Sequence, residues 1–233
     1  MREIVFDTET TGLDPQNGDR LVEIGCIELV NRVPSGRTFH GYFNPDRSMP
    51  REAEAVHGLS EAFLADKPRF PERVEELLEF LGEAKLVAHN AGFDFGFVNF
   101  ELNACGLAPL SRERMIDTVA IARTRHPGAK LSLDALCTRY GIDRSHRVKH
   151  GALLDAELLA QLYVELTGGR QIGLELTAEA SAIAAGANGG AVVRRREWRA
   201  PRAHAPSPEE LEAHEHFLTT LTDPLWASGE LPG

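Results

Sequence analysis

The order of apolar segments in residues 1–167 constrains the fold more than any other feature of the chain. Apolar residues with strand character come first, around Ile4, Val5 and Phe6, at 20–30 and at 38–43, and Pro34–Ser35–Gly36 between the last two predicts a hairpin turn. Further strands at 85–89 and 114–116 then alternate with helical segments. These helices are expected at 50–56, 71–81, 93–105, 118–125, 132–140 and 152–167. Hairpin strands followed by strand–helix alternation predict an α/β fold, with a mixed sheet covered by helices on both faces.

The character of the sequence changes after Gly168, and three parts are expected: a compact domain over 1–169, a flexible linker over 170–206 and a tail over 207–233. Residues 178–191 hold seven Ala and three Gly, with little to bury. Ser207, Pro208 and Glu210 form a helix-start signature, and the helix that follows carries Leu211 and Phe217. This tail is too small to fold alone, but it offers apolar side chains.

Composition narrows the cellular setting and the class of function. The 233 residues carry a net charge of −10, which argues against an autonomous, tight nucleic-acid binder, because Lys and Arg contacts to phosphates dominate such affinity. A nucleic-acid substrate stays compatible with this charge if metal ions mask the carboxylates and a partner delivers the strand. Neither a signal peptide nor a membrane-length apolar segment is visible, and the three cysteines are scattered. A cytoplasmic protein without a membrane partner is expected.

Four carboxylates stand at the ends of predicted elements. Asp7 and Glu9 follow the first strand and, two residues apart, point to the same face. Asp94 and Asp155 each lie near the start of a helix, at the head of an apolar stripe. Taken alone, Asp7 and Glu9 are better explained by a solvated strand end, and Asp94 and Asp155 by a favourable helix dipole. Together, the four indicate a site for two divalent metal ions, Mg²⁺ or Mn²⁺, since hard cations prefer oxygen ligands.

His150 is the candidate general base. It lies five residues before Asp155 in a predicted turn, and a His beside a metal-bound water can accept its proton near neutral pH. Read in isolation, His150 is better explained as a surface-loop residue. His89, at a strand end, is expected to be structural, and Asp117 is expected to cap a helix.

Three motifs carry a resemblance to a known family. D-T-E-T-T-G-L at 7–13, H-N-A-G-F-D at 89–94 and H-G-A-L-L-D-A at 150–156 resemble the motifs of the DEDDh exonucleases. The resemblance implies a ribonuclease H-like, three-layer α/β/α fold and removal of nucleotides in the 3′ to 5′ direction with two metal ions. It assigns Asp7, Glu9, Asp94 and Asp155 to the metals and His150 to the base.

The same resemblance suggests how the terminal nucleotide is bound. Glu52 and His57 are expected to contact it, while the backbone of the turn after the first strand and the side chain of Leu13 hold its base. The full expected substrate-binding set is Asp7, Glu9, Thr10, Thr11, Gly12, Leu13, Glu52, His57 and Asp155.

Within the family, residues 132–143 and 166–170, and more faintly 209–215, are similar to the proofreading subunits of bacterial replicative DNA polymerases. The substrate implied is a single-stranded 3′ end of DNA, and the partners are the polymerase (alpha) subunit and the sliding clamp (beta). Gln171, Leu174 and Leu176 resemble a clamp-docking peptide, although both leucines could instead pack back on the domain. An RNA-trimming exonuclease and a non-catalytic adaptor are the alternative functions.

Overall fold

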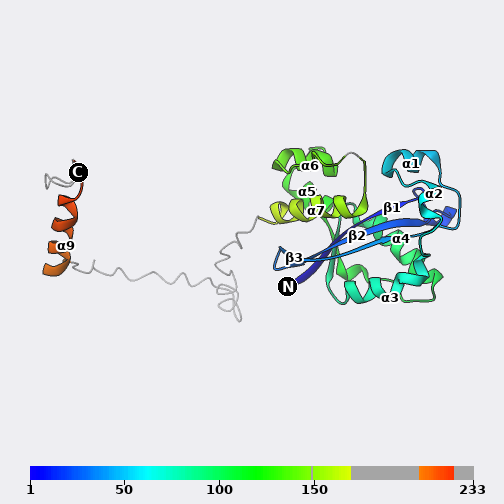
Figure 1. Ribbon diagram of the computed structural model, residues 1–233, viewed down its shortest axis with the longest axis horizontal. Helices are drawn as coiled ribbons and strands as arrows, with labels where there is room; N and C mark the ends of the chain where they lie inside the picture. The colour runs from blue at the N-terminus through cyan, green and yellow to red at the C-terminus, as the bar shows by residue number, and fades with distance from the viewer. Residues whose placement is uncertain (148, 169–204, 223–233) are drawn as a thin grey trace, which may run out of the picture. The chain divides into compact units, whose positions relative to one another are not determined.

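The computed structural model describes residues 1–147, 149–168 and 205–222 (Figure 1). The chain divides into two units, Met1–Leu174 and Glu175–Gly233. The strands of the first unit are β1 (Arg2–Thr10), β2 (Leu21–Val30), β3 (Val33–Tyr42), β4 (Lys85–Ala88) and β5 (Met115–Asp117). Its helices are η1 (Pro15–Asn17), α1 (Arg51–His57), α2 (Glu61–Leu64), α3 (Phe70–Leu81), α4 (Ala91–Ala104), η2 (Arg112–Arg114), α5 (Thr118–Arg125), α6 (Leu133–Tyr140) and α7 (Ala152–Leu166).

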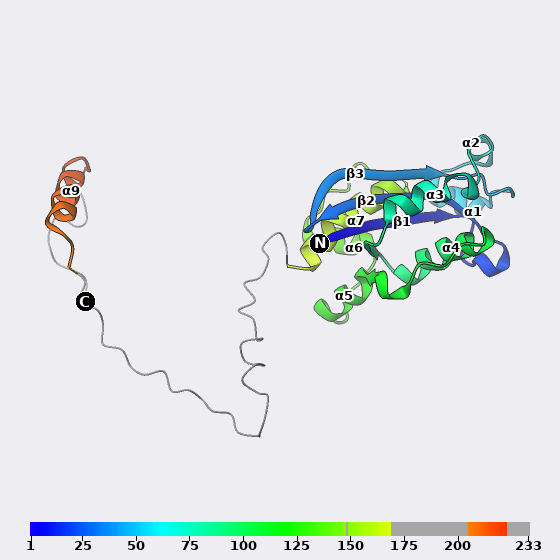
Figure 2. The same ribbon diagram turned by 90° about the horizontal axis from the view of Figure 1, so that it is seen from below.

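The five strands form one mixed sheet in the order β3-β2-β1-β4-β5. β1 pairs antiparallel with β2 and parallel with β4, and β4 pairs parallel with β5. Figure 2 shows β3, β2 and β1 side by side, with β3 on the outside. β1 is therefore the central strand, and its carboxyl end lies where the parallel strands β1 and β4 both finish.

Helices cover both faces of this sheet, because alternate residues of β1 enter two separate cores. Ile4 and Phe6 pack with the apolar faces of α3 and α4. Val5 packs on the opposite face with side chains of α5, α6 and α7. Figure 1 shows α5, α6 and α7 on the upper side of the sheet and α3 below it. The predicted three-layer α/β/α architecture is confirmed.

The predicted hairpin turn is wrong in position. Pro34, Ser35 and Gly36 lie inside β3, and the chain reverses at Asn31 and Arg32, which adopt left-handed backbone angles with φ of 52° and 64°. Proline is tolerated in β3 because an edge strand has one side free of ladder hydrogen bonds. The turn-like composition of 34–36 was therefore a misleading signal. The one-turn helix α2 was also missed, because four residues give no periodicity to detect.

The described part of the second unit is the helix α9 (Pro208–Thr219), and its predicted start is confirmed. The Ser207 hydroxyl accepts a hydrogen bond from the Glu210 amide, and the Glu210 carboxylate accepts one from the Ser207 amide. Leu211 and Phe217 are exposed within this unit. Among the described helices of both units, none combines the length and apolar character needed to cross a bilayer.

Candidate active site

The end of β1 supplies the first two carboxylates. Asp7 and Glu9 share the face of the sheet that Val5 presents to α7, because side chains alternate along a strand. Glu9 stands directly opposite Glu23 of β2 in the antiparallel register. Glu9 is buried and Asp7 partly so. Asp7 and Glu9 thus point to the same face of the sheet, as predicted.

Asp155 reaches this place because α7 begins unusually close to the sheet. It lies in the first turn of α7 and is buried. A Cβ atom on Gly25 of β2 would lie 2.3 Å from the backbone of Leu153, so only glycine allows the approach. Because Gly25 has no side chain, the start of α7 lies close to the sheet, and this approach sets the distance of Asp155 from β1 and β2.

Asp94 arrives from the other layer. β4 ends at Ala88, the chain turns through Asn90 with φ of 65°, and Asp94 falls in the first turn of α4. Its Oδ1 accepts a hydrogen bond of 2.7 Å from the Thr8 hydroxyl. Thr8 lies between Asp7 and Glu9, so this contact ties Asp94 to the same strand end.

Crowding of these acids changes their protonation. Burial, followed by the negative charges of Asp94, Glu9 and Asp155, raises the pKa of Asp7 well above its usual range. Burial and then the charge of Glu23 raise the pKa of Glu9 from 4.5 to about 8. Burial raises the pKa of Asp94 to about 7, although its hydrogen bond with Thr8 opposes the change. Buried carboxylates that resist ionisation are typical of a site built for additional positive charge.

The donor set fits divalent metal ions. Glu9, His150 and Asp155 each offer a ligand atom, and these atoms all lie within 4.8 Å of one another. Asp7 and Asp94 are outside that triplet, but the charge of Glu9 raises the pKa of Asp7, and the charge of Asp94 raises the pKa values of both Asp7 and Glu9. Carboxylate oxygens beside one imidazole are a donor set that divalent metal ions can use.

The His150 loop lies against two helices. The His150 amide donates to the carbonyl of Val56 in α1 at 3.3 Å, and the ring Nδ1 lies 3.3 Å from a carboxylate oxygen of Asp155. The side chain is about half exposed, at 48%. His150 is thus both beside the acids and open to solvent, as a general base acting on water must be.

Sequence reasoning missed Arg147, whose guanidinium contacts both carboxylate oxygens of Asp155 and also the ring of His150. Its spacing, three residues before His150, was the available signal, but a basic residue in a turn looks like ordinary surface.

The predicted structural roles of His89 and Asp117 are confirmed. His89 bonds Thr118 and the carbonyl of Leu131, and the Asp117 side chain accepts from the Val119 amide at the start of α5.

The turn after β1 presents the predicted base-contacting residues. Leu13 is 85% exposed, the highest value among the exposed large hydrophobic residues of the described structure. The turn is braced by a residue that the sequence did not reveal, because the Asp19 carboxylate accepts from the Asp14 amide and from the Thr11 hydroxyl. A Cβ on Gly12 would lie 2.2 Å from Asp19 Oδ2, so the brace requires glycine at this position.

Glu52 and His57 lie on α1, and they differ in burial. Glu52 is exposed, whereas His57 is buried at the end of the helix. The His57 Nδ1 accepts from the Leu59 amide at 3.0 Å, and its Nε2 has no hydrogen-bond partner among the described residues. Burial lowers the pKa of His57, which favours the neutral ring. A neutral, unpartnered ring nitrogen is suited to a ligand's hydrogen bond.

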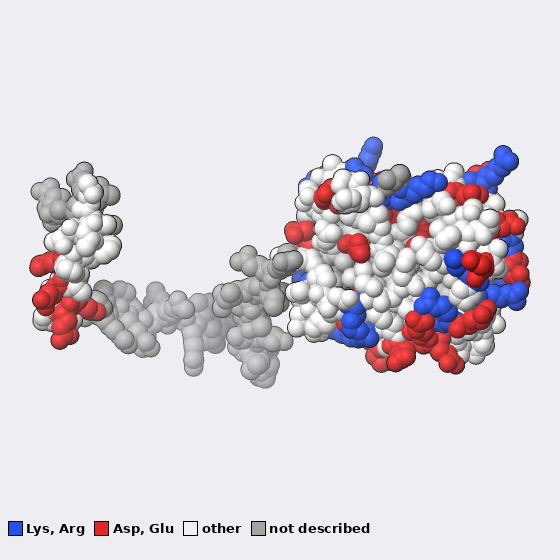
Figure 3. Space-filling model, viewed as in Figure 1, with Lys and Arg blue, Asp and Glu red and all other residues white. Residues whose placement is uncertain are grey.

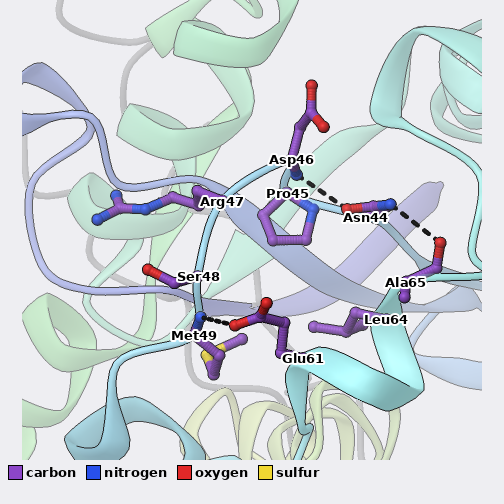
Figure 4. A pocket seen from close by; sticks show the side chains of 9 residues that line it. All are labelled: Asn44, Pro45, Asp46, Arg47, Ser48, Met49, Glu61, Leu64 and Ala65. Atoms are coloured by element: carbon purple, nitrogen blue, oxygen red, sulfur yellow. Dashed lines mark hydrogen bonds between the residues drawn. The ribbon is translucent and has the colours of Figure 1, made fainter.

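One pocket of the described structure lies away from these residues. It has a volume of about 340 Å³ and is lined by the 44–49 loop together with Glu61, Leu64 and Ala65 (Figure 4). It holds none of the predicted site residues. Arg47 connects it to the active-site turn, because its guanidinium bonds Asp19 at 2.9 Å.

The surface charge agrees with the acidic composition. On the face shown in Figure 3, acidic side chains gather along the lower side of the first unit, where Figure 1 places α3, and Lys and Arg are scattered. Gln171, Leu174 and Leu176 lie outside the described residues.

Comparison with known proteins decides the family. The model of a family described as Exonuclease matches residues 4–163. The chain is 46% identical over 227 residues to the DNA polymerase III subunit epsilon of Rickettsia felis, covering 95% of this chain and 97% of that protein. It is 42% identical over 231 residues to the protein of the same name from Salmonella typhimurium, covering 93% and 92%. The chain belongs to the exonuclease family, in the group of DNA polymerase III epsilon subunits.

Solved structures agree with this assignment. Exonuclease X, in complex with 5′ overhanging duplex DNA, is 28% identical with a TM-score of 0.56, covering 71% of this chain and 90% of that one. The nuclease domain of 3′hExo, a DEDDh family member bound to rAMP, is 17% identical with a TM-score of 0.63, covering 71% and 91%, and shows the shared fold. This exonuclease is thus a metal-dependent enzyme acting 3′ to 5′, as the three motifs predicted.

Proposed function

We propose that this exonuclease is the proofreading subunit of a DNA polymerase III and hydrolyses mismatched 3′-terminal nucleotides of single-stranded DNA with two metal ions. The observation that carries the proposal is the clustering of Glu9, His150 and Asp155 at the end of the central strand, beside Asp7 and Asp94. The relatives named epsilon, which match almost the full length of the chain, support a replicative DNA substrate over RNA trimming and over an adaptor without activity.

The proposed ligands of the metal ions are Asp7, Glu9 and Asp155, with Asp94 completing the second site. When bound, two Mg²⁺ or Mn²⁺ ions would neutralise the carboxylates and stabilise charge developing on the attacking and leaving oxygens. The chain's own part in proton transfer falls to His150. Its ring nitrogen takes a proton from the attacking water, and its half-exposed position lets that proton pass to solvent.

Terminal-nucleotide binding is proposed for the residues around the β1 turn and α1. The exposed Leu13 side chain would pack on the terminal base, with the backbone of Thr10, Thr11 and Gly12 beneath it. Glu52 and the unpartnered His57 Nε2 would meet the sugar–phosphate from α1. Apolar packing on a base face does not discriminate among bases, which suits an enzyme that must remove any nucleotide.

Two attachment points are proposed for the rest of the replicase, in the cytoplasm where the bacterial chromosome is copied. The alpha subunit would bind the 207–233 tail, whose α9 helix exposes Leu211 and Phe217 within its own unit. The beta clamp would bind Gln171, Leu174 and Leu176. Each contact is short and would be weak alone. Within one replicase, attachment of the chain through one contact would raise its effective concentration at the other.

The test compares matched DNA and RNA oligonucleotides, single-stranded and labelled at the 5′ end, with and without Mg²⁺ or Mn²⁺. Metal-dependent 3′ to 5′ shortening that is faster on DNA is expected. His150→Ala should lower the rate by about a hundredfold or more, as expected on losing a general base, while His89→Ala tests a histidine outside the cluster. Faster shortening of RNA, or full activity of the His150 variant at neutral pH, would contradict the proposal.

A further inference from the structure

The function proposed above gives Arg147 no role, yet its guanidinium has the most contacts in the site. Nε and Nη2 donate to the two oxygens of Asp155, the second at 2.6 Å. Nη1 donates to Oδ1 of Asp134 in α6 at 2.9 Å, and Nη2 lies 2.8 Å from Nδ1 of His150. Only 9% of the side chain is exposed. An arginine so little exposed, with all three guanidinium nitrogens in contact with partners, is a built feature of the site.

The Arg147 guanidinium also places a positive charge among the acidic side chains of the site. Asp155 is 3% exposed, and Arg147 is its bidentate partner. Asp155 in turn offers a ligand atom within 4.8 Å of those of Glu9 and His150, so the guanidinium lies at the proposed metal site. In the structure as described, Arg147 therefore supplies positive charge at the carboxylates that would hold the metal ions.

Arg147 and a metal ion compete for Asp155 in this arrangement. Both Asp155 oxygens already accept a hydrogen bond from the guanidinium, and a metal ion would have to approach at least one of the same oxygens. Two cations sharing one buried carboxylate would also repel each other strongly, because the interior screens charge poorly. Asp134 offers Arg147 a second carboxylate that it already contacts.

We propose that Arg147 is a positioning residue that acts as the resident counter-cation of Asp155 and is displaced onto Asp134 when metal binds. While it is on Asp155, it holds the imidazole of His150 next to the acids, and on leaving it frees both the carboxylate and the His150 Nδ1. Metal binding and release of the general base become one linked event. This inference rests on the metal site of the proposed function.

The experiment is calorimetric titration of the full chain with Mn²⁺ alone, without substrate. Arg147→Ala removes the competing cation, so binding of Mn²⁺ should become tighter by about tenfold or more, and the melting temperature in EDTA should fall because Asp155 loses its partner. Arg144→Ala is the matched control. Arg144 pairs with the same Asp134 at 2.8 Å but not with Asp155, so its loss removes no cation from the metal site and should change Mn²⁺ affinity much less than Arg147→Ala does.

Asp134→Asn gives an independent test that keeps Arg147 in place. Without the receiving carboxylate, Arg147 stays on Asp155, and Mn²⁺ binding should weaken several-fold. Unchanged or weaker affinity in Arg147→Ala, or unaltered affinity in Asp134→Asn, would overturn the role of Arg147 while leaving the proposed function intact. Failure of the unaltered protein to bind Mn²⁺ would overturn both.

Discussion

At the scale of one residue, the buried Glu9 carboxyl lowers the stability of the folded protein when no metal ion is bound. Its pKa is raised from 4.5 to about 8, first by burial and then by Glu23. Between these two values the folded state binds more protons than the unfolded state, so stability falls as pH rises through this window. The Glu9 carboxyl by itself should therefore make the metal-free protein lose stability from about pH 5 to pH 8, by roughly 1.4 kcal/mol per pH unit at the steepest.

The measurement is the melting temperature in EDTA across that range. Glu9→Gln should flatten the decline, because the amide has no proton to lose, and Mg²⁺ or Mn²⁺ should reduce it in the unaltered protein. Glu165→Gln, an exposed change on α7, is the control and should leave the slope as it is. A stability that increases from pH 5 to pH 8 without metal would contradict the assignment.

The residues that the sequence revealed are those whose role follows from local spacing. Asp7 and Glu9 are two apart on a strand, and Asp94 and Asp155 each begin a helix, so periodicity alone gives their direction. Arg147 and Asp19 were missed for the opposite reason. Their partners, Asp155 in α7 and the Thr11–Asp14 turn, are brought to them by the folded chain, and a charged loop residue has no pattern that marks such a partner.

At the scale of elements, the site depends on how closely α7 approaches β2. The contact is made at Gly25, where an added Cβ would lie 2.3 Å from Leu153 backbone atoms. Backbone cannot yield as a side-chain tip can, so Gly25→Ala should push the start of α7 away and carry Asp155 with it. We expect a loss of about 1–3 kcal/mol in the free energy of unfolding, typical of an overpacked core, and a loss of metal binding and nuclease activity.

Gly96→Ala is the matched control, since Gly96 lies in the exposed middle of α4 and an added Cβ there meets nothing within 4 Å. It should stabilise the protein by about 0.5–1 kcal/mol, because alanine favours helix. Chemical denaturation and Mn²⁺ titration of both variants provide the comparison. A Gly25 variant that keeps native metal affinity would show that the close approach does not place Asp155.

The layer order could be predicted from the sequence, whereas the turn of the β2–β3 hairpin could not. Strand–helix alternation and apolar faces determine which elements form and which face they bury, as the two cores on either side of β1 show. The hairpin turn depends on left-handed angles at Asn31 and Arg32, and arginine is a residue that rarely signals this conformation. Pro34 and Gly36 carried the stronger turn signal, but lie in an edge strand that tolerates both.

At the scale of the whole molecule, catalysis and attachment should be separable, because the carboxylates and His150 all lie before residue 156 and the proposed contacts after residue 170. Deleting 207–233 should abolish binding to the alpha subunit and leave binding to the beta clamp and nuclease activity on single strands unchanged. Gln171→Ala with Leu174→Ala should do the reverse, weakening the clamp contact and sparing the alpha subunit. Each variant is thus the control for the other.

Surface-plasmon-resonance binding to each purified partner, with the nuclease assay run in parallel, would test this division. Clamp binding by the double variant should fall to the same extent with and without the tail, because the tail is proposed to contact the alpha subunit and not the clamp. Alpha-subunit binding that survives the tail deletion would place that contact on the exonuclease domain instead. Clamp binding unaffected by the Gln171 and Leu174 changes would mean that these residues do not dock on the clamp, as expected if Leu174 packs back on the domain.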